Sequence, residues 1–129
     1  MRNPNPKEIE AVSKLPAFKR YQHLIKHVAD TEIVFVLVDE YGTCAMSEVE
    51  GKHLLAIWPA AAYAELNKVG EWSPYTVEPL ALEHFMQQVV PEAANIGHLI
   101  DAFPMNDKTG FVVSSEELLR DLQAELSNY

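Results

Sequence analysis

Residues 33–42 read IVFVLVDEYG, a short apolar run followed by turn residues. The run Ile33–Val38 is too short for a typical helix and rich in β-branched residues, so it predicts a strand buried on both faces. Asp39-Glu40-Tyr41-Gly42 supplies turn chemistry, because Gly42 can adopt a positive φ. Thr43–Val49 and His53–Ile57, separated by Glu50-Gly51, predict two more strands, and the three together predict an antiparallel meander.

Shorter extended segments downstream complete the predicted sheet. Tyr75–Pro79 is expected to form a short edge strand. His98–Phe103 and Phe111–Val113 are expected to pair as a hairpin around the turn-rich segment Asn106–Gly110.

The segments between these strands have apolar residues at helical spacing. We expect a short helix over Lys7–Lys14 and a second over Ala17–Val28, which presents an aromatic and aliphatic face. A third is expected from Trp58-Pro59 to about Lys68. A fourth, carrying Leu82 and Phe85, is expected to end at Pro91.

The last element has the clearest local pattern. Ser114 and Glu117 form a capping box, in which each side chain can satisfy a backbone N–H at the start of a helix. The apolar stripe that follows consists of Leu118, Leu119, Leu122 and Leu126. These residues predict a C-terminal helix docked on the core.

Together the elements predict the α+β class, with a largely antiparallel or mixed sheet of about five to six short strands and helices packed on it. The chain has 129 residues, of which 48% are apolar, as is usual for one globular domain. We therefore expect a single layered domain over residues 1–129, with residues 1–6 frayed.

Charge is divided unevenly along the chain. Residues 1–27 hold six Lys and Arg against two Glu, a net of +4, whereas residues 28–129 carry a net of −13. An acidic body repels phosphate backbones, so no nucleic-acid partner is expected. The basic segment either packs over the acidic surface of its own chain or serves as a contact arm.

The same composition predicts a cytoplasmic protein. Cys44 is the single cysteine, so no intrachain disulfide is possible, and the N-terminus lacks an apolar signal region. The longest stretch low in charge, Leu54–Ala64, is far shorter than the roughly 20 residues of a membrane span. No membrane partner is expected.

No pattern of catalytic, cofactor-binding or metal-binding residues is found. His23 and His27 are four residues apart on a helix, but Leu24 stands where a zinc protease has its glutamate. Cys44 lies in an apolar strand, and the glycines are spread singly rather than gathered in a phosphate-binding loop. We expect no stoichiometric metal, no cofactor and no enzymatic activity.

Two groups of residues are candidates for partner contact. The polar face of the Ala17–Val28 helix carries one group, and aromatic residues around the third helix form the other. The alternative for the aromatic residues is packing in the core and loops. The candidates are Lys19, Arg20, His23, His27, Trp58, Trp72 and Tyr75.

Several residues recur in an order and spacing that point to one bacterial family. They are Leu15-Pro16, Lys19-Arg20-Tyr21, Val28-Ala29-Asp30, Gly42, Gly51, Trp58-Pro59, Tyr63-Ala64, Trp72, Phe85, Gly97 and Phe103-Pro104. In these residues the chain, from about Leu15 to Leu126, resembles the bacterial domain-of-unknown-function family 2750, with Phe35 where that family often has tryptophan. The resemblance implies a small stand-alone protein without catalytic residues to carry over. A fainter similarity is to the SseB group of type III secretion regulators.

Two classes of function remain open on the sequence. The first is a protein-binding module, such as an adaptor or an inhibitor of a basic partner, acting as a monomer or weak homodimer with an unknown protein partner. The second is a small enzyme or ligand-binding domain whose site is assembled from dispersed His and Asp/Glu residues. A pocket with converging His and carboxylate side chains would favour the second class, and a flat acidic or aromatic patch the first.

Overall fold

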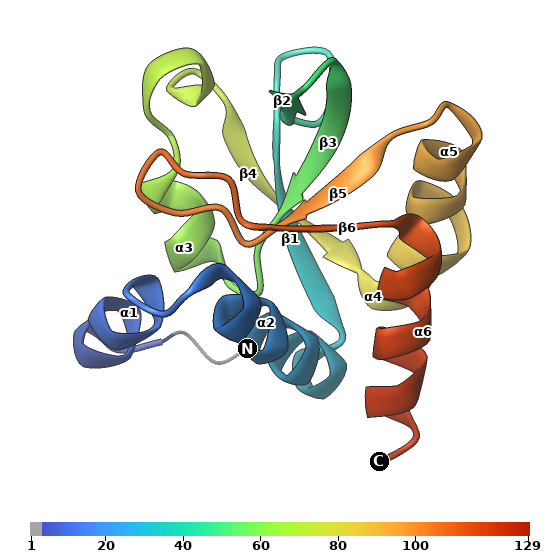
Figure 1. Ribbon diagram of the computed structural model, residues 1–129. Helices are drawn as coiled ribbons and strands as arrows, with labels where there is room; N and C mark the ends of the chain where they lie inside the picture. The colour runs from blue at the N-terminus through green and yellow to red at the C-terminus, as the bar shows by residue number, and fades with distance from the viewer. Residues whose placement is uncertain (1–3) are drawn as a thin grey trace.

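Strand β1, Ile33–Val38, runs through the middle of the protein (Figure 1). The computed structural model describes residues 4–129. Along its whole length β1 pairs antiparallel with β4, Thr76–Ala81. On its other side, two isolated bridges, Phe35 to Trp58 and Val38 to Cys44, join it to a second sheet. The expected central buried strand and edge strand are thus both present, and they pair with each other.

The second sheet has four strands in the order β2-β3-β5-β6. These strands are β2 (Met46–Val49), β3 (Lys52–Ile57), β5 (Leu99–Ala102) and β6 (Phe111–Val113). The β2–β3 and β5–β6 pairs are antiparallel hairpins, whereas β3 and β5 are parallel. Parallel neighbours need a long crossover, which here runs through helices between residues 57 and 99. The sheet is therefore mixed, and the α+β class is confirmed.

The predicted three-stranded meander is wrong in its first pairing. The Ala45 N–H donates to the Leu37 carbonyl at 2.7 Å, but the Ala45 carbonyl accepts from the Ala56 N–H at 3.3 Å. The chain therefore changes partner at Ala45, and β2 starts three residues later than the predicted Thr43. Of the segment that follows the turn, only the short stretch around Cys44 and Ala45 bonds to β1, and the full-length partner of β1 is the distant β4.

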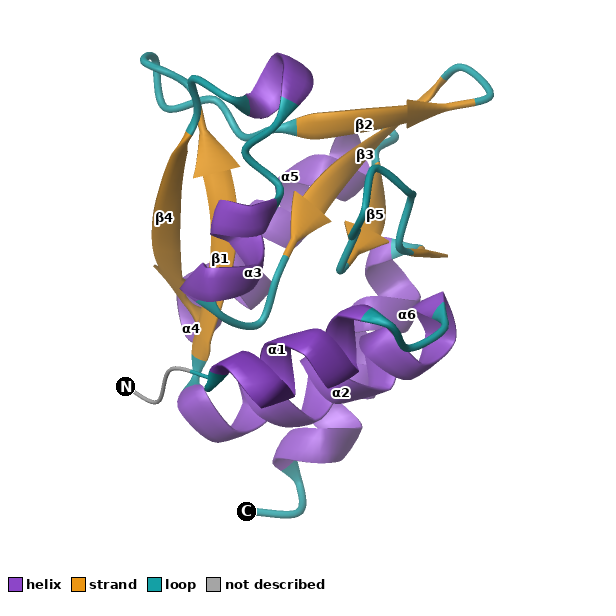
Figure 2. Cartoon of the chain, turned by 90° about the vertical axis from the view of Figure 1, so that its left-hand side faces the viewer, coloured by secondary structure: helices purple, strands orange, loops and turns teal. Residues whose placement is uncertain are grey.

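Three helices lie together beneath the sheets (Figure 2). They are α1 (Pro6–Ser13), α2 (Ala17–Thr31) and α6 (Ser115–Leu126). The Ser114 hydroxyl accepts from the Glu117 N–H at 3.1 Å, as the capping box predicts. Leu118 and Leu122 are fully buried, so the C-terminal helix is part of the core.

The crossover helices differ from the prediction at their ends. Helix α3 is Ala61–Leu66, so it starts after Pro59, and a 3₁₀ turn, η1, follows at Gly70–Trp72. Helix α4 (Leu82–His84) continues through the π turn η2 (Phe85–Val89) into α5 (Val90–Asn95). Pro91 does not end this helix, because the wider π turn places it at the first turn of α5, where a missing N–H costs little.

The core lies between the helices and the two sheets and includes Trp58, Tyr63, Phe85 and Phe103. Among residues 4–129, no helix combines the length and apolar character that crossing a bilayer requires.

Candidate functional site

A cavity of about 490 Å³ opens where the loop between β5 and β6 meets the segment after α3. We call Phe103–Gly110 the 103–110 loop and this cavity the loop pocket. In Figure 1 the loop extends from the sheet towards α3 and α1. Residues of β2 and β5, the segment Asn67–Trp72 and the loop itself line the pocket.

Asp101 in β5 lies at the base of the loop pocket with its side chain fully buried. Its Oδ2 accepts from the Ser47 hydroxyl at 2.6 Å, and its Oδ1 accepts from the Gly110 N–H at 2.6 Å. Burial raises the pKa of Asp101, although both hydrogen bonds and the Arg20 charge act in the opposite direction. Asp101 therefore links β2, β5 and the end of the loop.

Two buried side chains from distant elements hold the start of the loop. Arg20 donates from Nε to the Phe103 carbonyl at 3.0 Å, and Trp58 donates from Nε1 to the Pro104 carbonyl at 2.9 Å. Phe103 has a φ of 65°, which is rare for a bulky residue. Such a backbone persists only where its surroundings fix it, and these two hydrogen bonds do so.

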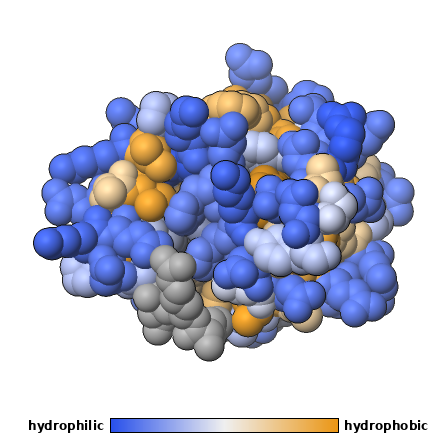
Figure 3. All heavy atoms as spheres, turned by 90° about the horizontal axis from the view of Figure 1, so that it is seen from below, coloured by the Kyte–Doolittle hydropathy of each residue, from blue (hydrophilic) through white to orange (hydrophobic). Residues whose placement is uncertain are grey.

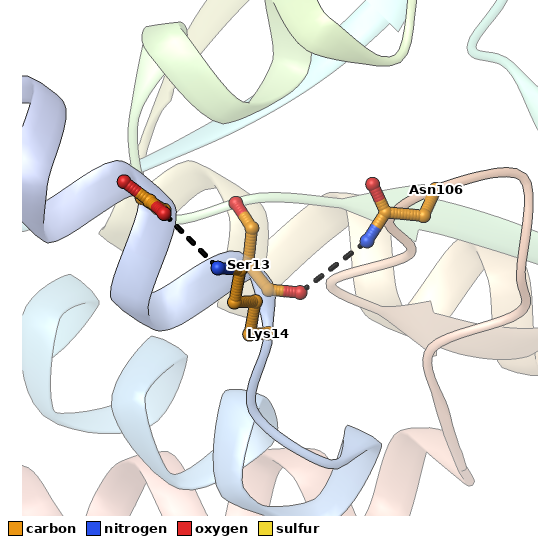
Figure 4. Close-up of polar contacts among 4 residues, drawn as sticks. Ser13, Lys14 and Asn106 are labelled. Carbon is orange, nitrogen blue, oxygen red and sulfur yellow. Dashed lines mark hydrogen bonds and ion pairs between the residues drawn. The ribbon is translucent and has the colours of Figure 1, made fainter.

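Two asparagines hold the middle of the loop. Asn67 donates to the Met105 sulfur at 3.3 Å and to the Tyr63 carbonyl at 2.8 Å. Asn106 donates to the Ser13 carbonyl at 3.4 Å at the end of α1, beside Lys14 (Figure 4). The 103–110 loop is thus tied to α1, α2, α3 and the sheet.

An aromatic wall and an apolar rim complete the pocket. The ring of Trp72, half-buried, meets that of Trp58 edge to face with centroids 5.9 Å apart. Val69, which lines the pocket, is 51% exposed, and Leu66, the last residue of α3, is 53% exposed. Large apolar side chains of this exposure beside a tryptophan are typical of a binding surface.

The pocket is acidic. Its lining includes the acidic residues Glu71, Asp101 and Asp107 and one lysine, Lys108; Glu48 also borders it, but its side chain shares the face of its cross-strand partner His53. His53 lies at its edge, but Glu48 pairs with His53 and Ser47 with Leu54, so strand alternation places His53 on the face opposite to Ser47. The His53 ring stacks instead on His98, with centroids 5.6 Å apart.

The structure corrects two of the candidates for partner contact. Arg20 is only 7% exposed and Trp58 is fully buried, so neither side chain can meet a partner directly. Helical periodicity placed Arg20 on the polar face of α2, but the 103–110 loop covers that part of the helix. Trp58 packs in the core, which was the alternative to partner contact for the aromatic residues.

The other candidates lie on two different parts of the protein. Lys19 is exposed on α2, whereas Trp72 and Tyr75 are half-buried near the loop pocket. The half-buried His23 and His27 stack on each other at 5.6 Å, and the His23 ring contacts those of Tyr63 and Phe103. The structure does not bring the basic face and the aromatic residues into one site.

Asp101, Ser47 and Gly110 were missed as site residues. One signal was available for Asp101, because a carboxylate in the apolar run Leu99–Phe103 needs a hydrogen-bonding partner if it is buried. Within residues 4–129, no three His, Cys, Asp or Glu side chains are grouped so as to hold a metal ion.

These features define a small α+β domain with a mixed sheet and an acidic, aromatic-walled pocket. The chain belongs to the family described as "Protein of unknown function (DUF2750)", whose model matches residues 21–122. The matched span contains Trp58, Asp101 and the whole 103–110 loop. No curated protein matches the chain. The similarity to the SseB group has no support in these comparisons.

Proposed function

We propose that the protein is a non-catalytic binding module that accepts a positively charged side chain of a protein partner in the loop pocket. The observation that carries the proposal is the joint placement of the Trp72 ring and the exposed acidic residues Glu71 and Asp107 around one cavity. A lysine or arginine side chain combines an apolar stem with a cationic end, and it matches such a surface.

The rim of the pocket supports a protein partner rather than a free small cation. Val69 is exposed and lines the pocket together with Trp72, and apolar residues around an aromatic anchor are typical of protein interfaces. The net charge of −9 favours approach of a basic partner at low ionic strength. Since Cys44 is a free cysteine, we place this activity in the reducing cytoplasm.

A small enzyme is the second candidate, because His53 and Asp101 line the same cavity. General acid–base catalysis needs such groups within hydrogen-bonding reach of one substrate. The opposite faces of Ser47 and His53 argue against this arrangement, and the Asp101 oxygens are already engaged by Ser47 and Gly110. Binding without catalysis is therefore the better-supported proposal.

The test uses short peptides that contain one arginine or lysine in an otherwise neutral sequence. Matched peptides carry citrulline or acetyl-lysine at the same position, which keeps the shape but removes the charge. Titration is followed by the NMR signal of the Trp72 indole N–H, assigned with a Trp72→Phe variant. We expect the charged peptides alone to shift that signal, with an affinity that falls as salt increases.

The pocket variant is Glu71→Gln with Asp107→Asn, and the control is Glu92→Gln with Glu116→Gln. Both remove two exposed carboxylates, but only the first pair lines the pocket. We expect the pocket variant to weaken peptide binding by roughly tenfold and the control by about twofold at most. Equal binding of charged and neutral peptides, or equal loss in both variants, would exclude recognition of a cation in this pocket.

A further inference from the structure

A second hollow, of about 620 Å³, lies between α2 and α6. It shares no lining residue with the loop pocket. We call it the α2–α6 groove, and its lining includes Phe18, Tyr21, Ile25, Lys26, Asp121 and Glu125. In Figure 3, which views the molecule from the side where these helices lie, hydrophilic side chains surround small apolar patches.

The groove has an aromatic component that the fold leaves open. Phe18 is 49% exposed, although its ring packs edge to face on Phe111 at 5.2 Å. The Tyr21 hydroxyl donates to Asp121 at 2.5 Å, which links the two helices. A surface that buried Phe18 would therefore gain apolar contact area without displacing this link.

The two sides of the groove carry opposite charges. Lys19 and Lys26 are exposed on α2, which carries no acidic residue between them, whereas Asp121 and Glu125 stand on α6. Within the described chain, neither Lys26 nor Glu125 forms an ion pair. A partner of one sign would be attracted by one side of the groove and repelled by the other.

We propose that the α2–α6 groove is the interface of a homodimer with twofold symmetry. A twofold axis across the groove places α2 of each chain against α6 of the other. Lys26 of each copy then lies against Glu125 of the other copy, so the same ion pair forms twice in the dimer. The same arrangement buries both Phe18 side chains. A surface with one basic and one acidic side is complementary to itself under this symmetry, which is why the occupant is a second copy of the chain.

The dimer is expected to be weak. Exposed ion pairs contribute little and are screened by salt, so affinity rests on the small apolar area around Phe18. The charges determine the geometry of the dimer more than its strength.

The test measures self-association of the full chain by sedimentation at low and high salt. Lys26→Glu and Glu125→Lys are studied alone and mixed in equal amounts, with Lys52→Glu, at the exposed first residue of β3, as the charge-matched control. We expect each groove variant alone to lose self-association by roughly tenfold, and the control to behave as the wild type. In the equal mixture both contacts regain opposite charges, so association should return. Circular dichroism checks that every variant is folded.

A wild type that remains monomeric at millimolar concentration would overturn the proposal, and any partner of the groove would then be another molecule. A dimer that is indifferent to both substitutions would place the interface elsewhere. Loss of association in each variant without recovery in the mixture would contradict the twofold pairing of Lys26 with Glu125. These outcomes are independent of peptide binding at the loop pocket, because the two sites share no residue.

Discussion

Two connections between strands are fixed in opposite ways in this protein. The Asp39–Thr43 turn is held by its own first residue, because Asp39 Oδ1 accepts from the N–H groups of Tyr41 and Thr43, each at 2.9 Å. The 103–110 loop is held by side chains far away in the chain, since its carbonyls accept from Arg20 and Trp58. The first connection is a local structure, and the second exists only in the assembled fold.

The two connections also differ in which residues adopt a positive φ. In the Asp39–Thr43 turn the positive φ falls on a glycine, Gly42, which adopts it without cost. In the 103–110 loop it falls on Phe103, Asn106 and Asp107. Such conformations cluster at functional sites because the surrounding structure must hold them. Asparagine and aspartate tolerate a positive φ, so the strain is that of Phe103, and it adds to the case that the loop pocket is the functional site.

The largest effect is expected from Arg20→Met. The substitution keeps an unbranched stem but removes the donors to the Phe103 and Leu15 carbonyls, of which the first is buried. We expect a loss of about 3 kcal/mol in the free energy of unfolding, measured by denaturant titration. Lys19→Met, on the exposed neighbour, is the matched control and should change stability by less than about 0.5 kcal/mol. Equal losses in the two variants would mean that Arg20 does not hold the loop.

Gly110→Ala tests the close approach of the loop to β5. A Cβ at this position would lie 2.2 Å from the Ala102 carbonyl oxygen and 2.7 Å from the Phe103 carbonyl carbon. Backbone atoms cannot move aside cheaply, so we expect a loss of about 2 kcal/mol. Gly42→Ala is the comparison, because a Cβ there meets nothing within 4 Å but the φ is +81°. Its loss of stability measures the cost of a positive φ alone, whereas the loss in Gly110→Ala measures steric overlap. A neutral Gly110→Ala would show that the loop does not pack this tightly.

Asp101→Asn tests the carboxylate beneath the loop through pH. Burial raises the pKa of Asp101 above the unfolded value of 3.8, so the folded protein holds this proton more tightly than the unfolded chain. The contribution of Asp101 to stability is therefore full below that value and is lost as pH rises through the folded pKa.

Asparagine has no such proton and can still accept from the Gly110 N–H. The stability of the Asp101→Asn variant relative to wild type should therefore increase as pH rises through this window and level off above it. Denaturant titrations of both proteins from about pH 3 to about pH 8 measure the difference. A difference that is constant with pH would contradict a raised pKa at Asp101.

Much of the fold could be predicted from local patterns. The capping box at Ser114, the apolar run Ile33–Val38 and the β5–β6 hairpin each depend on residues close in sequence. The partner of β1 could not be predicted in this way, because the choice between residues 43–49 and β4 depends on where the chain turns at Ala45. The continuation of the predicted helix past Pro91 was also missed, since a π turn has no clear sequence pattern.

The site was predictable only in part, because its residues converge through long-range contacts. Trp72 was singled out as an aromatic near α3, and it does line the loop pocket. Arg20 was assigned to the surface by helical periodicity, but periodicity cannot reveal that the 103–110 loop, more than 80 residues later, covers that face. Asp101 has no motif around it, and its partner Ser47 is 54 residues away.

The smallest effect is expected from Asp39→Ala, in the connection that is held locally. Its carboxylate bonds are exposed to solvent, so water can replace them and the loss should be about 1 kcal/mol. The expected loss is smaller than that of Arg20→Met because of burial: a carbonyl that loses its donor in the interior cannot form a hydrogen bond with water instead. Asp39→Asn, which keeps an acceptor oxygen, should recover most of the loss. Hydrogen exchange of the Tyr41 and Thr43 amides gives a local readout, which should accelerate in Asp39→Ala while exchange in the 103–110 loop is unchanged. Faster exchange in both connections would mean that the turn and the loop are coupled, and the distinction between local and long-range fixation would fail.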